Sequence, residues 1–254
     1  MATRFVSADS IVRQIWGRAD TVLFIFAGAA AEFALNKAVD WLYFTGRLPA
    51  DPLGRLFSTV TYARQIIFSD EETALKSIDK ITAIHKGVEE NRGMQIPDWA
   101  YRDVLFLLID YSIRSFELLD RQLTGDEKAE VFDVFDRVGK RMGLKGLPTT
   151  YTEWVQMRET HLQENLVYSD FTKDLYLQYK KHLGLLRYGL LIQVQLLLVP
   201  GRVSALLLLG KPIWIGPTLG LYKLLRRMKI EGVFRDALLP LKYKAAILDL
   251  NNNV

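Results

Sequence analysis

The chain has 254 residues, of which 50% are hydrophobic and 24% charged, and it carries 33 lysines and arginines against 29 aspartates and glutamates. This composition excludes a disordered chain, and the small basic excess does not indicate nucleic-acid binding, so we expect no nucleic-acid partner. Cysteine is absent, which excludes disulfides, thiolate catalysis and cysteine-ligated metal centres. We predict one domain over residues 1–254, because no linker or internal repeat divides the chain.

Apolar residues recur with helical spacing along most of the chain, and strand-like alternation is nearly missing, so we predict an all-α fold. After a short N-terminal helix, a helix rich in small residues is expected over residues 21–43. Its segment TVLFIFAGAAAEF resembles the core of a secretory signal, but Asp9, Asp20 and the helical spacing before it favour a helix of the fold. The uncharged runs, such as residues 188–201, are too short to cross a membrane.

Capping residues mark the start of the next helices. Asp51 followed by Pro52 predicts a helix that runs to about residue 68. Ser69 and Glu72 stand at capping-box spacing and predict a helix that ends near residue 93. The nearly apolar stretch from about residue 97 to 123 is predicted to be the buried central helix.

Three further helices are expected after the central one. Thr124 and Glu127 form a second capping box, for a helix that stops at Gly143. Thr152 is expected to cap a helix to about residue 167, and Ser169 to begin the next.

The C-terminal part, residues 183–254, is rich in leucine and basic residues. From Gly201 to the end there are nine lysines and arginines against three acids. Such a mixture is typical of a core helix with a solvated basic face, and also of a helix at a membrane surface. We expect a cytoplasmic protein, with peripheral membrane contact left open and the oligomeric state not set by the sequence.

His85 is one of three histidines, and it lies on the apolar side of its predicted helix, with Ile78, Ile81 and Val88 at helical spacing. It is therefore expected to point inward. On the preceding helix Arg55 and Thr59 are four residues apart and share a face. An inward, neutral imidazole near a cation and a hydroxyl could bind a haem iron.

The alternative for His85 is an ordinary core histidine that is bonded to a carbonyl, with Arg55 paired to a nearby acid. For His161 and His182 a surface position is the default, and a second iron ligand is the alternative. Motifs for hydrolases, kinases, dinucleotide-binding enzymes and zinc proteases are missing, and so is the ExxH spacing of di-iron sites.

The segment ADPLGRLFSTVTYARQIIFSDEETALKSIDKITAIHKGV, residues 50–88, resembles the signature region of the oxygenase family that includes the rubber-cleaving latex clearing protein and the fungal MpaB oxygenase. Its pattern is D-P-x-x-R-x-x-x-T, then G/S-D/T-x-x-x-A, then an H-x-x-V helix. The flanking stretches GRADTVLFIFAGAAAEFAL and VLFLLIDYSI extend the similarity, which is clearest over residues 10–148.

The resemblance implies an all-helical fold with a globin-like core and haem b bound through His85, the metal ligand. It also implies that Arg55 and Thr59 lie at the haem site, as cofactor-binding and catalytic residues. Members with a known reaction cleave a carbon–carbon double bond of an isoprenoid with dioxygen. The chain departs from the pattern at Leu105 and Leu107, where many members carry histidine and threonine, and at Ser58, where a rubber-cleaving member offers lysine.

We therefore predict a haem-b-dependent oxygenase that uses dioxygen on an apolar substrate, an isoprenoid or another unsaturated lipid. A non-catalytic helical protein that binds a lipid or small molecule at a membrane surface is the alternative. A structural, partner-binding scaffold is a third interpretation.

Overall fold

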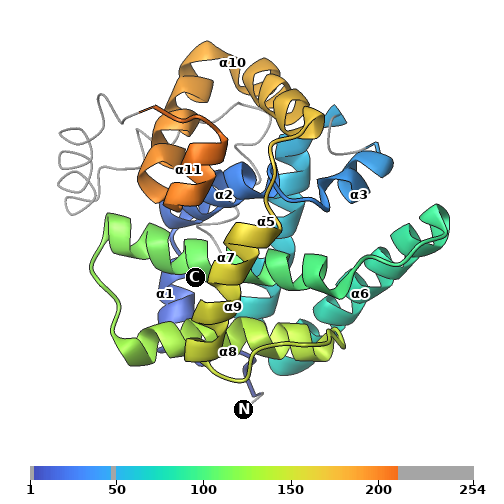
Figure 1. Ribbon diagram of the computed structural model, residues 1–254. Coiled ribbons are helices and arrows are strands. Elements are labelled where there is room, and N and C mark those ends of the chain that lie inside the picture. Colours follow the sequence, from blue (N-terminus) through green and yellow to red (C-terminus); the bar gives the residue numbers. More distant parts are fainter. Residues whose placement is uncertain (1–2, 47–49, 211–254) are drawn as a thin grey trace.

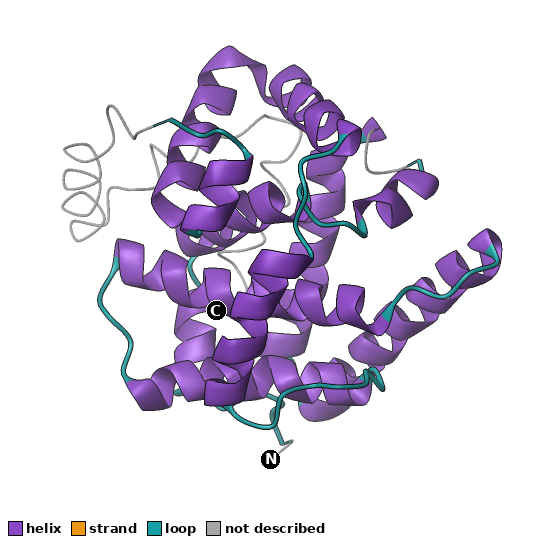
Figure 2. Cartoon of the chain, in the orientation of Figure 1, coloured by secondary structure: helices purple, strands orange, loops and turns teal. Residues whose placement is uncertain are grey.

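The computed structural model describes residues 3–46 and 50–210, and ten helices run through them (Figure 1). These residues contain no strand, only the isolated bridges Arg4–Asp70 and Asn36–Leu166, and short loops join most of the helices (Figure 2). The predicted all-α fold is confirmed. The globin-like core and the single domain stay predictions. Within the described part of the chain, no helix combines the length and apolar character that crossing a bilayer requires.

Helix α7 (Asp98–Leu119) is the central element, as the sequence predicted. Thirteen of its residues are buried, and it packs against α1 (Ile11–Trp16), α2 (Ala19–Phe33), α8 (Gly125–Arg141), α9 (Tyr151–Glu164) and α10 (Asp170–Leu198). Because helices cover it on several sides, α7 is buried over most of its length, and its buried residues are mainly apolar, with Asp103 and Asp110 among the exceptions. Helices α5 (Pro52–Phe68) and α6 (Glu71–Arg92) form a pair, and α3 (Val39–Phe44) and α11 (Gly201–Leu206) are short.

Most predicted helix starts match the observed caps. The Asp51 carboxylate accepts a hydrogen bond from the Gly54 amide at 3.0 Å, and Pro52 occupies the first turn of α5. Thr124 and Glu127 form the reciprocal capping box of α8, and Ser169 caps α10. These contacts satisfy amide groups that have no partner inside the helix. Because they need only nearby residues, short sequence patterns locate the helix starts.

Two predicted caps are wrong. The cap of α6 is Asp70, whose carboxylate accepts from the Thr73 amide at 2.9 Å, whereas the Ser69 hydroxyl donates to the Gln65 carbonyl at the end of α5. The cap of α9 is Thr150 rather than Thr152. Ser69 and Asp70 both have extended backbone geometry, but the Ser69 hydroxyl is used by the last turn of α5, so Asp70 is left to cap α6. Before α9 the extended residue is Thr150, and Thr152 already lies inside the helix.

The helix predicted over residues 21–43 is divided into α2 and α3. At the break, the Asn36 side chain donates to Asp103 at 3.2 Å and accepts from the Ala38 amide at 2.8 Å. The Lys37 amide donates to the Asn165 carbonyl at 2.9 Å. These long-range contacts replace the helical hydrogen bonds, so local spacing did not reveal the break.

The C-terminal prediction is covered only in part. Residues 183–206 belong mainly to α10 and α11, and residues 211–254 lie outside the described residues. Helix α10 bends sharply at Gly184, where φ is 72° and ψ is 170°. Only glycine adopts this backbone geometry without strain, so the position divides the helix into two arms.

Gly28 sets how closely α2 approaches α7. A Cβ atom at this position would lie 2.3 Å from Cδ1 of the Tyr111 ring. Tyr111 is fully buried, and its hydroxyl donates to Glu32 at 2.9 Å. We therefore expect Gly28→Ala to lower the free energy of unfolding by about 2–4 kcal/mol, through overpacking and strain on this hydrogen bond.

Urea denaturation of both proteins measures the difference. The control is Gly87→Ala in α6, where nothing lies within 4 Å of the added Cβ, so the better helix propensity should leave stability unchanged or raise it by up to about 1 kcal/mol. Equal stability of the two variants would mean that the α2–α7 contact can relax freely.

Candidate functional site

A cavity of about 310 Å³ lies among α5, α6 and α7, with α2, α3 and α8 contributing further wall residues. Its lining is mainly apolar, and its polar and charged side chains are few. Ile84 and Val104 line it and are each 39% exposed, so the cavity reaches the surface between α6 and α7. The volume falls within the range of about 300–1,000 Å³ that is usual for small-molecule and cofactor sites.

The three residues singled out in the sequence, Arg55, Thr59 and His85, all line this cavity. Helix α5 supplies Arg55 and Thr59, and Tyr62 continues the same face. Helix α6, which packs against α5, supplies His85 one turn after Ile81. Arg55 and Thr59, on one face of α5, and His85 on α6 therefore line one cavity.

The imidazole of His85 is held neutral. Burial, and then the positive charge of Arg55, lower its pKa to about 4, although Glu89 acts in the opposite direction. Its Nδ1 atom is buried and has no hydrogen-bond partner among the described residues. An unpaired buried nitrogen is costly, which makes it a candidate ligand atom.

Tyr101 packs its ring edge-on against His85, with the ring centroids 5.2 Å apart and the planes at 81°. The Tyr101 hydroxyl donates to Glu89 at 3.0 Å, and the Ile96 amide donates to the same oxygen at 2.9 Å. These contacts fix Tyr101 and so limit the rotation of the His85 ring. Sequence reasoning missed Tyr101, because sixteen residues separate it from His85.

On α5 two hydroxyls turn back to the backbone. Thr59 Oγ1 and Ser58 Oγ donate to the Arg55 carbonyl at 3.2 Å and 2.8 Å. In this arrangement each hydroxyl offers an acceptor lone pair to the cavity while its proton is used. Leu105 and Leu107 are buried and line the cavity, so the wall they form is apolar.

Helix α3 closes one side of the cavity through Trp41. The guanidinium of Arg92, at the end of α6, lies 4.0 Å from the centre of the Trp41 ring and pairs with Asp40 at 2.7 Å. A cation over an aromatic face, with a carboxylate beside it, is a favourable contact. The contact fastens α3 to the same helix that carries His85.

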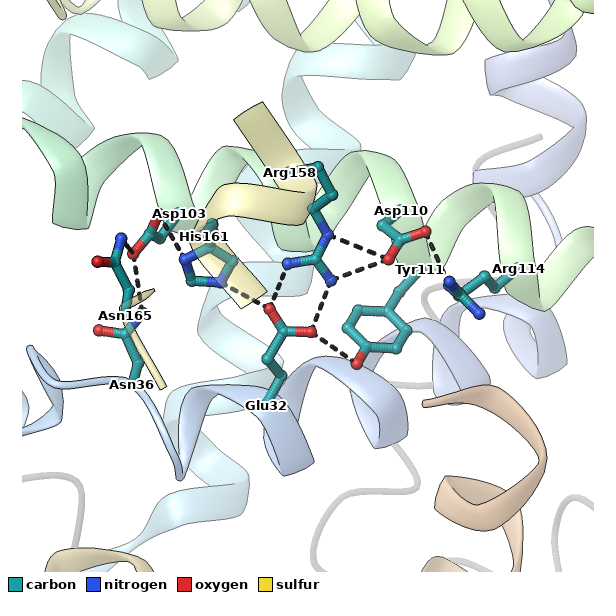
Figure 3. A network of polar contacts seen from close by, with 9 residues as sticks. All are labelled: Glu32, Asn36, Asp103, Asp110, Tyr111, Arg114, Arg158, His161 and Asn165. Atoms are coloured by element: carbon teal, nitrogen blue, oxygen red, sulfur yellow. Dashed lines mark hydrogen bonds and ion pairs between the residues drawn. The ribbon is translucent and has the colours of Figure 1, made fainter. Parts of the chain in front are cut away.

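A buried polar network lies next to the cavity and joins α2, α7 and α9 (Figure 3). Arg158 donates two hydrogen bonds to Glu32 and two to Asp110, the latter at 2.8 Å and 3.1 Å. Although burial opposes it, Arg158 lowers the pKa of Glu32 to about 2. Arg114 also pairs with Asp110, at 2.8 Å. The charges are therefore compensated, as buried charges must be.

His161 belongs to this network, and the surface position expected for it is wrong, since its exposure is only 3%. Its Nε2 lies 2.8 Å from a Glu32 oxygen and its Nδ1 lies 2.7 Å from an Asp103 oxygen. Burial alone would lower its pKa, but the two carboxylates raise it. With an acceptor on each side, the ring is favoured as an imidazolium. His182 is half-buried on α10.

Asn36 connects the network to the cavity. Asn36 lines the cavity and donates to Asp103, which also accepts from Asn165 at 3.0 Å. The sequence did contain a signal for the network. Glu32 and Asp110 interrupt very apolar stretches, and Arg158 and His161 share a helix face with buried Trp154.

The raised pKa of His161 predicts a loss of stability in alkali. The unfolded-state pKa is about 6.5, so this contribution is complete below that pH and disappears as the pH rises through the higher folded-state value. We expect His161→Gln to remove this dependence. Urea unfolding of both proteins between neutral and mildly alkaline pH measures it, and parallel stability curves would mean that the folded ring is neutral throughout.

Among the described residues, no group of three or more histidine, aspartate and glutamate side chains is arranged to hold a metal ion. A haem iron needs no such group, because a single histidine can hold it.

Residues 13–230 match the family model described as "ER-bound oxygenase mpaB/B'/Rubber oxygenase, catalytic domain". No curated protein matches the sequence. The matched range includes α5, α6 and α7, which line the cavity, and the buried network. Since the match covers most of the 254 residues, the chain belongs to the mpaB/rubber oxygenase catalytic-domain family.

Proposed function

We propose that the protein is a haem-b-dependent oxygenase that uses dioxygen on an apolar substrate, an isoprenoid or another unsaturated lipid. Membership of a family described as an oxygenase catalytic domain supports the reaction class. The observation that carries the proposal is the neutral imidazole of His85, with a buried and unpaired ring nitrogen, on the wall of a mainly apolar cavity.

The residues fit haem b in three respects. His85 stays uncharged well below neutral pH, so a lone pair is available to a metal. Arg55 lies close enough to shift the His85 pKa, and a guanidinium is suited to a propionate carboxylate. The apolar lining suits the face of a macrocycle. Haem b, when bound, supplies the iron centre that activates dioxygen.

The remaining side chains of the cavity have distinct roles. Arg55 would hold a propionate carboxylate or another negative charge that develops in the cavity. Thr59 can accept a hydrogen bond from a bound molecule but does not donate one to it, because its own proton is donated to the Arg55 carbonyl. Leu105 and Leu107 add apolar surface to the cavity wall, which would keep water away from a bound molecule and strengthen the electrostatic effect of Arg55.

An apolar substrate is favoured by the wall and by the mouth of the cavity. Ile84 and Val104 line the cavity and are partly exposed, so they offer apolar surface where a hydrocarbon chain would enter. Since the wall has few polar groups, recognition depends on shape and apolar area.

The test is haem reconstitution of the full chain, followed by dioxygen uptake. Purified protein titrated with haem should develop a Soret band that saturates at one haem per chain. Haem-loaded protein should then consume dioxygen with squalene or an unsaturated fatty acid and yield carbonyl products.

Squalane, the saturated analogue of squalene, is the control substrate, and it should support no uptake. Failure to bind haem would contradict the proposal outright. Haem binding without uptake on any unsaturated substrate would leave a haem protein and remove the oxygenase reaction.

A further inference from the structure

The bend of α10 at Gly184 presents an exposed apolar tip. Leu185 and Leu186 follow the bend and are 75% and 79% exposed, and Leu177 in the arm before it is 56% exposed. Helix α10 forms the upper edge of the molecule in the orientation of Figure 1. Leucines with so much exposure are unfavourable in water, and two adjacent ones at a bend indicate a contact surface.

The tip carries positive charge. Lys180 and Lys181 are exposed in the last turn before the bend, and neither forms an ion pair within the part of the chain that the structure describes. The sequence from residue 175 to 198 contains no aspartate or glutamate. Leucines beside lysines, without acids, are the combination that binds the interface of an anionic membrane.

We propose that this α10 elbow, formed by Lys180, Lys181, Leu185 and Leu186, docks onto the surface of a bilayer that contains anionic lipid. The leucines enter the boundary between headgroups and acyl chains, and the lysines contact the lipid phosphates and carboxylates. The bend is required, because a straight helix would not present both leucines at its outermost point.

Two other occupants fit less well. A symmetric dimer through this tip would bring the lysines of both copies to one interface, where they repel. A specific protein partner needs roughly 1,000 Å² or more of complementary surface, which a convex tip of two leucines does not offer. A bilayer accepts a convex tip of any shape.

Docking would bring the cavity close to the lipid. Tyr179 lines the cavity and precedes Gly184 by five residues, which is about 8 Å of helix. Membrane contact at the elbow therefore places one cavity wall near a store of apolar molecules. The proposal stands whether or not haem is bound.

The absence of cysteine allows one label to be attached at a chosen site. The full-length variant Leu186→Cys, labelled with an environment-sensitive fluorophore, should brighten and shift to the blue with phosphatidylcholine vesicles that contain phosphatidylserine. Val155→Cys is the matched control, since Val155 is 45% exposed on α9. Its label should not respond.

Vesicle sedimentation of unlabelled variants tests the contributions of the leucines and of the lysines separately. Leu186→Glu should weaken binding to anionic vesicles about tenfold or more, and Lys181→Ala about fivefold. Val155→Glu and Lys145→Ala, which change exposed residues elsewhere, should bind like the unmodified protein. Circular dichroism verifies that each variant is folded.

Three results would overturn the proposal. They are no binding to anionic vesicles, equal binding to vesicles of phosphatidylcholine alone, and binding that the elbow variants do not weaken. A response of the Leu186→Cys label to protein concentration without vesicles would instead identify a second copy as the occupant.

Discussion

Replacing His85 by alanine is expected to abolish haem binding, and with it any oxygenase activity. No other histidine lines the cavity, since His161 is held in the buried network and His182 lies on α10. The variant should show no Soret band at haem concentrations that saturate the unmodified protein. Its fold should persist, because loss of the ring only enlarges a cavity that is present in the unmodified protein. Absorption spectroscopy and circular dichroism measure the two outcomes.

A chemical rescue separates ligation from damage to the fold. His85→Gly should regain the band when imidazole is added, because the free ring can occupy the space left by the side chain. His182→Ala is the matched control and should bind haem normally. A full band in His85→Ala without imidazole would show that another residue holds the iron.

Replacing Arg158 by methionine is expected to have the largest effect on stability. It removes four hydrogen bonds and leaves Glu32 and Asp110 buried with too little positive charge. Breaking a buried ion pair by removing one partner typically costs about 3–5 kcal/mol, and we expect a loss of unfolding free energy in that range. Urea denaturation of the two proteins measures it.

Arg121→Met is the matched control, because Arg121 also makes a two-point contact with a glutamate, Glu127, but at the surface. Its loss should be about 0–1 kcal/mol. If Arg158→Met is too unstable to purify, adding Glu32→Gln should recover part of the stability, since the unpaired charge is then removed. A loss below about 1 kcal/mol in Arg158→Met alone would mean that water reaches the network.

Features that depend on a few neighbouring residues could be predicted from the sequence. The start of α5 at Asp51 and the capping box of α8 need only contacts between residues three apart. The shared cavity face of Arg55 and Thr59 follows from helical periodicity in the same way. The choice of Asp70 over Ser69 depended on the preceding helix, whose last turn uses the Ser69 hydroxyl.

Features that depend on distant contacts were not predicted. The break between α2 and α3 lies at Asn36, where Asp103 and the chain near Asn165 supply hydrogen-bond partners, and local sequence spacing does not indicate that these distant segments are close. For His161 the sequence predicts a surface position, because a single histidine in a charged helix usually lies at the surface. Its burial depends on carboxylates that come from two other helices.

Asn36 contacts both the buried charges and the cavity, so a change in these charges would affect a molecule that binds in the cavity. The Asn36 amide donates a hydrogen bond to Asp103 in the buried polar network, and Asn36 also lines the cavity that contains His85. Redesign of the cavity for a different guest is therefore constrained at Asn36 as well as at Arg55, Thr59 and His85. A substitution at Asp103, which does not line the cavity, should therefore still alter how that guest fits.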